Sequence, residues 1–343
     1  SCSQEVKHQV LELTEYDSIS VDIDYPYLSN YPHLTPCVRE GELYVVGYNY
    51  FEHYFDYVNL SGGKHFSVEM QREGADGVLT PGRYWVLENG IVCQTQVGIV
   101  ALDMEGKLRH RVSVKELVTS DDIYLIRPRG AAMGNYDYEG SLGSQCFIPL
   151  SPLNKEADVA IGKVYDADTR SLELLSALYP ESVKALFQVN SLTMPRINAL
   201  NADRIIYNFP YSSKVYQYDR QTQETLVMDM PSQTIANELD MKEFEISNAA
   251  EKGKKEMTTS RFDWVHYSVE ADKYYRVHHA GYEDFNDKEA SRMRKAYLMV
   301  YDEKNQTTKE YLLPSQFSAI YFIHDDVLYF DFDGTNDDVL TFA

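Results

Sequence analysis

One pattern constrains the fold of this sequence more than any other: a β-prone run, a tight polar turn and a second β-prone run recur six times. Turns such as Asn-Gly and Glu-Gly favour short hairpins, because their residues tolerate a positive φ. The second runs begin at intervals of 48 to 69 residues, which suits a repeat of one four-stranded sheet with its loops. The six hairpins cover 37–46, 84–93, 140–148, 198–207, 267–276 and 321–330.

A second hairpin follows the first in only five of the six repeats, at 57–70, 99–114, 162–175, 214–228 and 297–313. The sixth repeat lacks a strand, and the chain has two lone β-runs, one at 6–13 and one at 337–343. We expect these terminal runs to pair and complete the last sheet. Closure of this kind removes the exposed strand edges that an open array would leave.

The predicted fold is therefore an all-β, six-bladed β-propeller whose last blade is closed by N- and C-terminal strands. Residues 6–343 are expected to form this single domain, and 1–5 a tether. Seven blades stay open as an alternative, because 230–262 has room for an irregular one. A pair of β-sandwiches is weaker, since it leaves the matched terminal runs unexplained. Helix is expected only in connections, at 180–189 and 235–255.

The charge of the chain limits its partners. A formal net charge of -21 argues against nucleic acid and against an anionic membrane surface, because phosphate contacts need clustered Lys and Arg. No apolar run approaches the length of a membrane span. Contact with a membrane is therefore expected only through a lipid anchor.

Such an anchor is suggested by the first residues. Cys37, Cys93 and Cys146 lie inside apolar runs and are interpreted as core residues. Cys2 instead stands in Ser1-Cys2-Ser3, which is typical of a bacterial lipoprotein after removal of its signal peptide. Lipidation of Cys2 is the prediction, and an ordinary N-terminal cysteine or a cloning boundary is the alternative.

Arginine recurs where the predicted blades begin, although the chain has few cations. If the alignment of the repeats is right, these guanidinium groups surround one end of a central channel and bind a carboxylate, sulfate or phosphate. The alternative is that each pairs with an acidic side chain of a neighbouring blade. The candidate ligand-binding residues are Arg39, Arg83, Arg129, Arg196 and Arg261.

The same face is expected to carry the long insertions, at 127–140, 230–262 and 278–295, and several aromatic residues. Tyr211 and Tyr282 are added to the candidate ligand-binding residues, since exposed rings stack on sugars or contact a protein partner. Packing of the loops onto the blades is the alternative explanation for these rings.

The stretch "DKYYRVHH" at 272–279 ends in two adjacent histidines. Successive strand residues point to opposite faces, so His278 and His279 are not expected to bind one metal together. His278 aligns with packing positions of the other blades and is interpreted as a buried, hydrogen-bonded histidine. His279 falls where the strand ends and is kept as a candidate ligand-binding residue.

No catalytic signature is present, so no catalytic residue, metal ligand or cofactor is predicted. "DFDGTNDD" at 331–338 resembles the start of a calcium loop, with Asp331 and Asp333 as ligands. The match is incomplete, because no Glu stands at the twelfth position. An Asp-Gly hairpin turn is the favoured interpretation.

With Ser1-Cys2-Ser3, the blade pattern and many Tyr and Asp residues, the chain resembles the uncharacterised cell-envelope lipoproteins of Bacteroidetes with a six-bladed, TolB-like β-propeller. The resemblance implies a lipid-anchored protein of the periplasm or cell surface. The first hypothesis is a non-enzymatic binding or scaffolding propeller for a glycan, peptide or protein partner, with an anionic ligand as one option. The alternative is a propeller hydrolase or polysaccharide lyase acting at the channel mouth.

Overall fold

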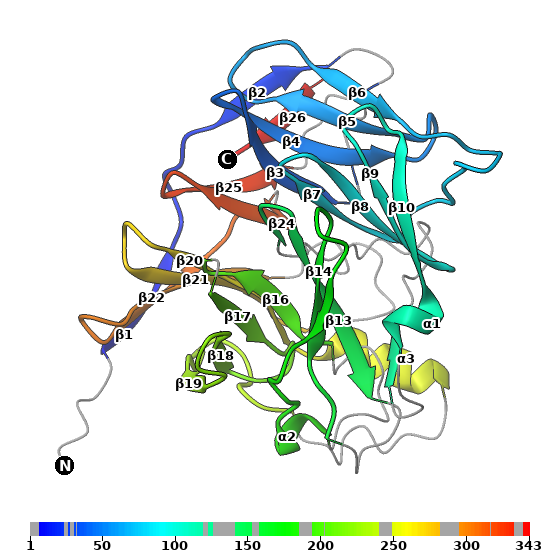
Figure 1. Ribbon diagram of the computed structural model, residues 1–343. Helices are drawn as coiled ribbons and strands as arrows, with labels where there is room; N and C mark the ends of the chain where they lie inside the picture. Colours follow the sequence, from blue (N-terminus) through cyan, green and yellow to red (C-terminus); the bar gives the residue numbers. More distant parts are fainter. Residues whose placement is uncertain are drawn as a thin grey trace. The chain divides into compact units, whose positions relative to one another are not determined.

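The computed structural model confirms an all-β chain built from six sheets, the six blades of a β-propeller (Figure 1). Sequence neighbours pair in the blades, as the hairpin pattern predicts, except that β1 and β2 join strands far along the chain in blades five and six. The described residues are 7–23, 27, 31, 33–118, 123–125, 141–152, 158–184, 194–201, 203–239, 249–281, 295–315, 317–332 and 339–343.

The first three blades follow one another along the chain. Blade one contains β3 (Leu34–Arg39), β4 (Glu42–Asn49), β5 (Tyr54–Asn59) and β6 (Phe66–Glu69). Blade two contains β7 (Arg83–Leu87), β8 (Gly90–Thr95), β9 (Gly98–Leu102) and β10 (Leu108–Ser113). Blade three contains β11 (Ile123–Leu125), β13 (Gln145–Pro152), β14 (Gly162–Asp166) and β15 (Leu172–Leu174), and β12 (Ser141–Leu142) pairs with β13.

The other three blades complete the repeat. Blade four contains β16 (Arg196–Ala199), β17 (Arg204–Asn208), β18 (Lys214–Asp219) and β19 (Thr225–Asp229). Blade five contains β20 (Arg261–Ser268), β21 (Lys273–His279), β22 (Ala296–Asp302), β23 (Thr307–Leu312) and β1 (Lys7–Glu12). Blade six contains β24 (Phe317–His324), β25 (Val327–Phe332), β26 (Val339–Phe342) and β2 (Ile19–Asp22).

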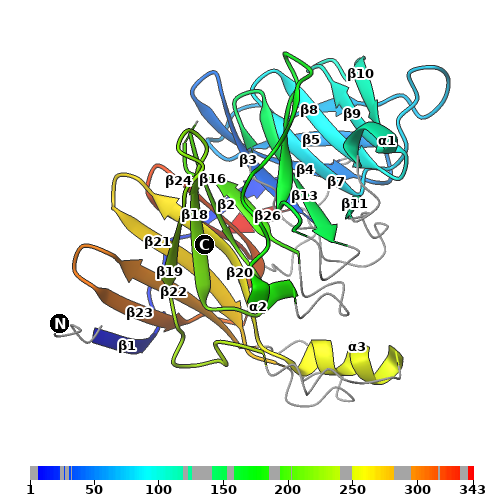
Figure 2. The same cartoon turned by 60° about the horizontal axis from the view of Figure 1, so that its bottom comes forward.

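The last blade is closed by N- and C-terminal strands, as expected, but the N-terminal partner differs from the predicted one. β26 pairs antiparallel with β2, so 19–22 supplies the closing strand. The predicted run at 6–13 forms β1, which adds to blade five parallel to β23 (Figure 2). Both segments are short strands near the N-terminus, and strand propensity alone does not decide which edge each one meets.

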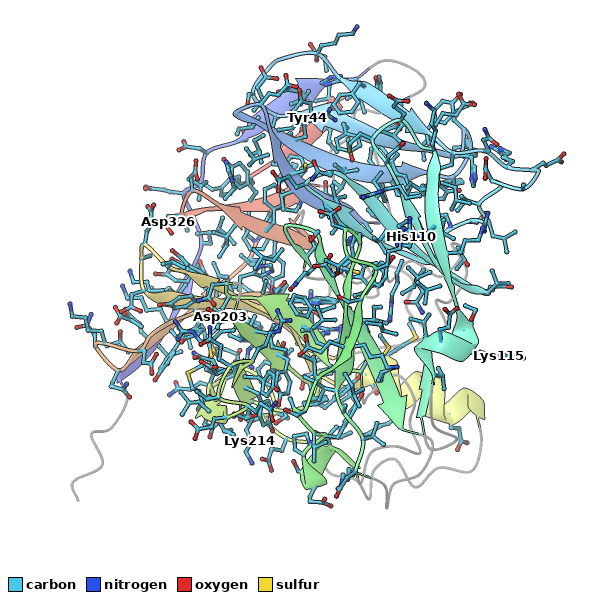
Figure 3. The ribbon with its side chains drawn as sticks, viewed as in Figure 1. Tyr44, His110, Lys115, Asp203, Lys214 and Asp326 are labelled. Carbon is cyan, nitrogen blue, oxygen red and sulfur yellow. The ribbon has the colours of Figure 1, made fainter. Side chains whose placement is uncertain are left out.

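Two of the hairpin turns have the backbone that a two-residue turn requires, whereas the predicted Asn-Gly turn is displaced because Gly90 begins β8 and pairs with Leu87. Glu40 and Gly41 have φ values of 54° and 81°, and Asp325 and Asp326 have 46° and 58°. Two successive positive φ values are what a two-residue turn between twisted antiparallel strands requires. Asp326 lies in one of these two turns, and Asp203 lies in the turn between β16 and β17 (Figure 3).

Helices are short and lie in connections. Those in the described part of the chain are α1 (Val114–Leu117), α2 (Glu181–Lys184) and α3 (Ala249–Thr258). α2 and α3 overlap the two segments for which helix was predicted. In its described residues, 230–262 contains α3 and the beginning of β20, and contributes no seventh sheet.

By compactness the chain divides into two units. One contains blades four and five with β1, and its core includes Ile206, Val265 and Met299. The other contains blades one to three and most of blade six. Cys93 and Cys146 are fully buried in its core, which confirms their interpretation, and Cys37 is half-buried against it.

Candidate functional site

The predicted arginines that the structure describes occupy two different positions, the beginning or the end of the first strand of a blade. Arg83, Arg196 and Arg261 each begin the first strand of a blade. Arg39 instead ends β3 and pairs with Glu42 across the hairpin turn, so its alignment with the others was wrong. β3 continues through Pro36, which the innermost strand of a blade tolerates because one side of its backbone is unpaired.

Some predicted residues cannot be placed. Cys2, Arg129, Tyr282 and Asp333 lie outside the described residues, and Asp331 lies in β25. Their proposed roles in lipidation, ligand binding and calcium binding remain predictions.

Three of the predicted residues meet at one carboxylate that sequence reasoning missed. Arg196 donates to Asp263 Oδ1, and His279 Nε2 lies 2.5 Å from Asp263 Oδ2. Arg261 Nε lies 3.8 Å from Asp263 Oδ1. Asn208 Nδ2 donates to the Asp263 carbonyl oxygen at 2.8 Å. We call these five residues the Asp263 cluster, and they come from blades four and five.

An irregularity in β20 places Asp263 in this cluster. The pairing register of β20 with β21 shifts between Phe262 and Val265, so Asp263 and Trp264 leave the regular ladder. Such bulges redirect side chains near the ends of strands. Trp264 lies under the Arg196 guanidinium, 4.2 Å from its carbon to the ring centroid, while the same guanidinium reaches the Asp263 carboxylate.

The cluster is buried and positively charged overall. Asp263 is 2% exposed and Arg196 9%. Burial alone would raise the pKa of Asp263, but the charges of Arg196, His279 and Arg261 outweigh it and hold that pKa well below its usual range. Among the five described residues of the cluster, one carboxylate thus faces two guanidinium groups, and their charges sum to an excess of positive charge even with His279 neutral.

Two groups in the cluster have unused bonding capacity. Arg261 makes no hydrogen bond to any residue that the structure describes, and a quarter of its side chain is exposed. Asn208 is fully buried, and its Oδ1 has no partner within the described ranges. The orientation of this amide is fixed, because the Asp263 carbonyl can only accept and must therefore face the Asn208 nitrogen.

Tyr211 lies next to this cluster along the chain. The Phe262 N–H donates to the Pro210 carbonyl at 2.7 Å, so the loop after β17 is bonded to the beginning of β20. Tyr211 follows Pro210 and is half-buried. The structure therefore brings Arg196, Arg261, His279 and the Tyr211 loop to one end of blades four and five. Arg83 begins β7 in the other unit and is buried there.

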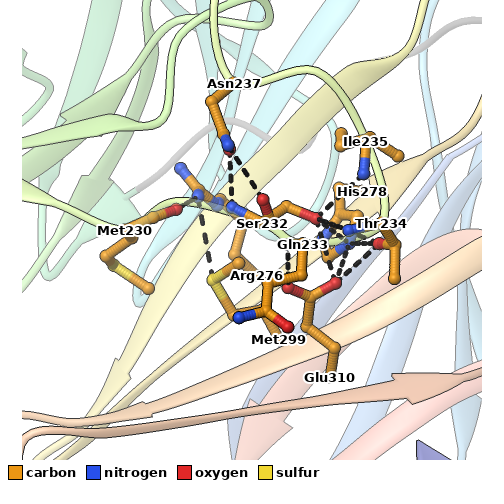
Figure 4. Close-up of polar contacts among 10 residues, drawn as sticks. All are labelled: Met230, Ser232, Gln233, Thr234, Ile235, Asn237, Arg276, His278, Met299 and Glu310. Atoms are coloured by element: carbon orange, nitrogen blue, oxygen red, sulfur yellow. Dashed lines mark hydrogen bonds and ion pairs between the residues drawn. The ribbon is translucent and has the colours of Figure 1, made fainter. Parts of the chain in front are cut away.

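A second polar cluster anchors the connection between blades four and five (Figure 4). Glu310 on β23 accepts hydrogen bonds from the hydroxyls of Ser232 and Thr234, at 2.9 and 2.6 Å, and from the Gln233 N–H at 2.8 Å. His278 Nε2 lies 3.1 Å from the same carboxylate. We call these five residues the Glu310 clamp.

The protonation states of the clamp follow from its burial. His278 and Glu310 are both 0% exposed. Burial lowers the pKa of His278, so the ring is neutral and its Nε2–H donates to Glu310. Burial opposes ionisation of Glu310, but hydrogen bonds from His278, Thr234 and Gln233 prevail and lower its pKa to about 2. His278 is thus the buried, hydrogen-bonded histidine that the sequence predicted.

The clamp does not have the geometry of a catalytic triad. Ser232, Thr234 and Glu310 all approach the same ring nitrogen of His278, and Nδ1 has no partner in the described part of the chain. A triad needs the hydroxyl on one ring nitrogen and the carboxylate on the other. The clamp therefore holds the connecting segment against blade five.

Neither acidic residue was singled out from the sequence. The one available signal is a lone acidic residue within an apolar strand, as Asp263 is in "RFDWVHYS". Across the described residues, no three His, Cys, Asp or Glu side chains are grouped to hold a metal ion. No helix in the same ranges is long and apolar enough to cross a membrane.

Comparison with known proteins agrees with this architecture. Residues 11–312 match the domain of unknown function DUF4221. The chain belongs to this family. A crystal structure of a DUF4221 member from Bacteroides vulgatus has 11% sequence identity and a TM-score of 0.70, with 96% of each chain covered. A putative exported protein from Bacteroides fragilis has 10% identity and a TM-score of 0.57, with 98% of this chain and 99% of that chain covered.

At these identities the likeness extends to the fold alone, and it confirms the predicted resemblance to propeller proteins of Bacteroidetes. No protein with a curated description matches the chain.

Proposed function

We propose that this DUF4221 chain is a non-enzymatic binding propeller of the cell envelope that holds an anionic group of its partner at the Asp263 cluster. The partner is a glycan, peptide or protein. The observation that carries the proposal is Arg261, a partly exposed guanidinium in a cluster whose one carboxylate is already neutralised by Arg196. Guanidinium groups bind planar oxyanions with paired donors, and burial of their surroundings strengthens the attraction.

An envelope location is supported by the Bacteroides fragilis relative, which is described as a putative exported protein. We further propose that a lipid on Cys2 anchors the chain. Labelling of cells with a clickable palmitate analogue should mark the expressed full-length protein and should not mark its Cys2→Ser variant. Equal labelling of both would remove the anchor from the proposal.

The anion site is tested by thermal unfolding and calorimetry of the purified chain with acetate, sulfate and phosphate at constant ionic strength. At least one anion should raise the Tm and give a measurable Kd. Arg261→Ala should weaken that Kd at least tenfold, and Arg261→Lys should weaken it less because a charge remains. Arg39→Ala is the matched control, since Arg39 lies at the hairpin end of its strand. An anion affinity that Arg261→Ala leaves unchanged would refute the site.

One observation favours an enzyme as the second candidate function. His279 and Asp263 form a buried carboxylate–imidazole pair beside Arg261, an arrangement that could neutralise a uronate carboxylate and orient a base for β-elimination. Incubation with an acidic polysaccharide should then release unsaturated products that absorb in the ultraviolet. The activity should fall at least a hundredfold in His279→Gln, and absence of product from the native chain would exclude this activity for the substrate used.

A further inference from the structure

The outermost strand of blade four exposes apolar side chains along an open sheet edge. Among the described strands, β19 pairs only with β18, so its other edge carries unpaired backbone groups. Leu226 and Val227, in the middle of β19, are 56% and 51% exposed. An open edge of this kind accepts a further strand unless the sequence protects it.

The sequence of β19 lacks the protection that another outermost strand has. In blade two, β10 carries Arg109 and Arg111, and its pairing register is interrupted between Leu108 and His110. Charges and bulges of this kind discourage edge-to-edge pairing. In β19, no charged residue stands between Glu224 and Asp229, and the register with β18 is continuous.

The backbone of β19 determines which residues a new strand would meet. The Glu224 carbonyl accepts from the Asp219 N–H at 2.9 Å, and the Met230 N–H donates to the Ser213 carbonyl at 3.2 Å. Because backbone groups alternate between the two edges of a strand, the residues of even number bond to β18. The groups that point to the open edge are those of Thr225, Val227 and Asp229.

We propose that β19 is an interface between two copies of this chain, in which the two β19 strands pair antiparallel about a two-fold axis at Val227. In this register Val227 lies opposite Val227 of the second copy, and Thr225 lies opposite Asp229. These pairs exchange both backbone hydrogen bonds, because their N–H and C=O groups all point to the open edge. Leu226 then lies opposite Met228, and no two acidic side chains oppose each other in a chain of net charge -21.

The residues that flank β19 limit this pairing to the strand itself. Gln223 has a φ of 60° in the preceding turn, and Pro231 has no N–H to donate. These two residues lie opposite each other in the proposed register, so the ladder ends at the same place on both sides. A symmetric interface of this kind closes as a dimer and does not extend into a filament.

The test is sedimentation equilibrium of the native chain over a range of concentrations. A monomer–dimer equilibrium is expected with a Kd on the order of micromolar, because one strand edge buries less surface than a standard interface. Val227→Lys places two ammonium groups opposite each other at the axis and should weaken the dimer at least tenfold. Val269→Lys is the matched control, since Val269 is 70% exposed in the β20–β21 turn, and should leave the Kd unchanged.

A mixture of two variants tests the register. Val227→Lys and Val227→Glu chains should each be largely monomeric and should form a dimer when mixed, because opposite charges then meet at the axis. Recovery on mixing also shows that both variants are folded. A native chain that stays monomeric at about 200 μM, species larger than a dimer, or no recovery on mixing overturns the proposal. The result does not depend on anion binding at the Asp263 cluster.

Discussion

Replacement of Glu310 by Gln should remove the contribution of this one carboxylate to the pH dependence of unfolding of blades four and five. In the folded chain the Glu310 carboxylate accepts from two hydroxyls, the Gln233 N–H and His278, and its pKa falls from 4.5 to about 2. A group whose folded pKa is depressed contributes stability above its unfolded pKa and loses that contribution as the pH falls through the folded value. The contribution of Glu310 is therefore present above about pH 4.5 and lost toward pH 2.

The size of the effect follows from the same values. The drop in pKa from 4.5 to about 2 corresponds to about 3 kcal/mol in the free energy of unfolding. Part of that shift comes from a positive charge on His278, and the expected value falls to about 2 kcal/mol because the buried ring is neutral. Glu310→Gln should thus be about 2 kcal/mol less stable than the native chain at pH 7 and about equally stable at pH 2.

The assay is urea unfolding at a series of pH values, monitored by tryptophan fluorescence. The chain has two tryptophans, and Trp264 lies in β20 of blade five. A Trp85→Phe background therefore makes the signal specific for blades four and five. Glu224→Gln, at an exposed turn position, is the matched control and should change stability little at any pH.

Protonation of His278 also favours unfolding as the pH falls below about 6.5, because burial lowers its folded pKa, but it acts in both proteins. The difference between native and Glu310→Gln curves isolates the carboxylate. If the free energies of unfolding of the two proteins differ by a constant amount, or not at all, from pH 7 to pH 2, the assignment of an ionised Glu310 in the clamp is refuted.

Three further predictions concern other buried contacts. Arg196→Ala should destabilise blades four and five by about 3–5 kcal/mol, because it leaves the buried Asp263 carboxylate without its main partner, and urea midpoints will show whether it does. Gly47→Ala should cost about 1–3 kcal/mol, since its Cβ would lie 2.2 Å from the Tyr31 ring; a double-mutant cycle should find no such cost in a Tyr31→Ala background. Burial raises the pKa of Asp56, so its charged form weakens the fold as the pH rises, and Asp56→Asn should raise the Tm at pH 8 but not at pH 3. An equal Tm change at both pH values would contradict this last assignment.

Much of the fold could be predicted because hairpins are local. The Glu40-Gly41 turn and its flanking strands lie within the 16 residues 34–49, so the hairpin can be predicted without any distant partner. Six such hairpins, at intervals of 48 to 69 residues, indicate six blades. The burial of His278 could also be predicted locally, because side chains alternate along a strand and His278 aligns with packing positions of the other blades.

The Asp263 cluster could be predicted only in part. Arginine at the beginning of a strand is visible in the sequence, and Arg196 and Arg261 were found by that signal. Their shared partner was not, because Arg196 and Asp263 are separated by 67 residues and meet only when two blades pack together. The bulge that redirects Asp263 leaves no mark in the composition of β20.

The sequence by itself thus determined the repeating hairpins, the number of blades and the cationic beginnings of several strands, since each depends on neighbours in the chain. The tertiary structure decided which N-terminal segment closes blade six, that Arg39 lies at the other end of its strand, and which carboxylate each arginine meets. The pairing of β2 with β26 joins segments more than 300 residues apart, and Arg196 and Asp263 are separated by 67 residues. In both cases many partners satisfy the same local propensities, and only packing selects one.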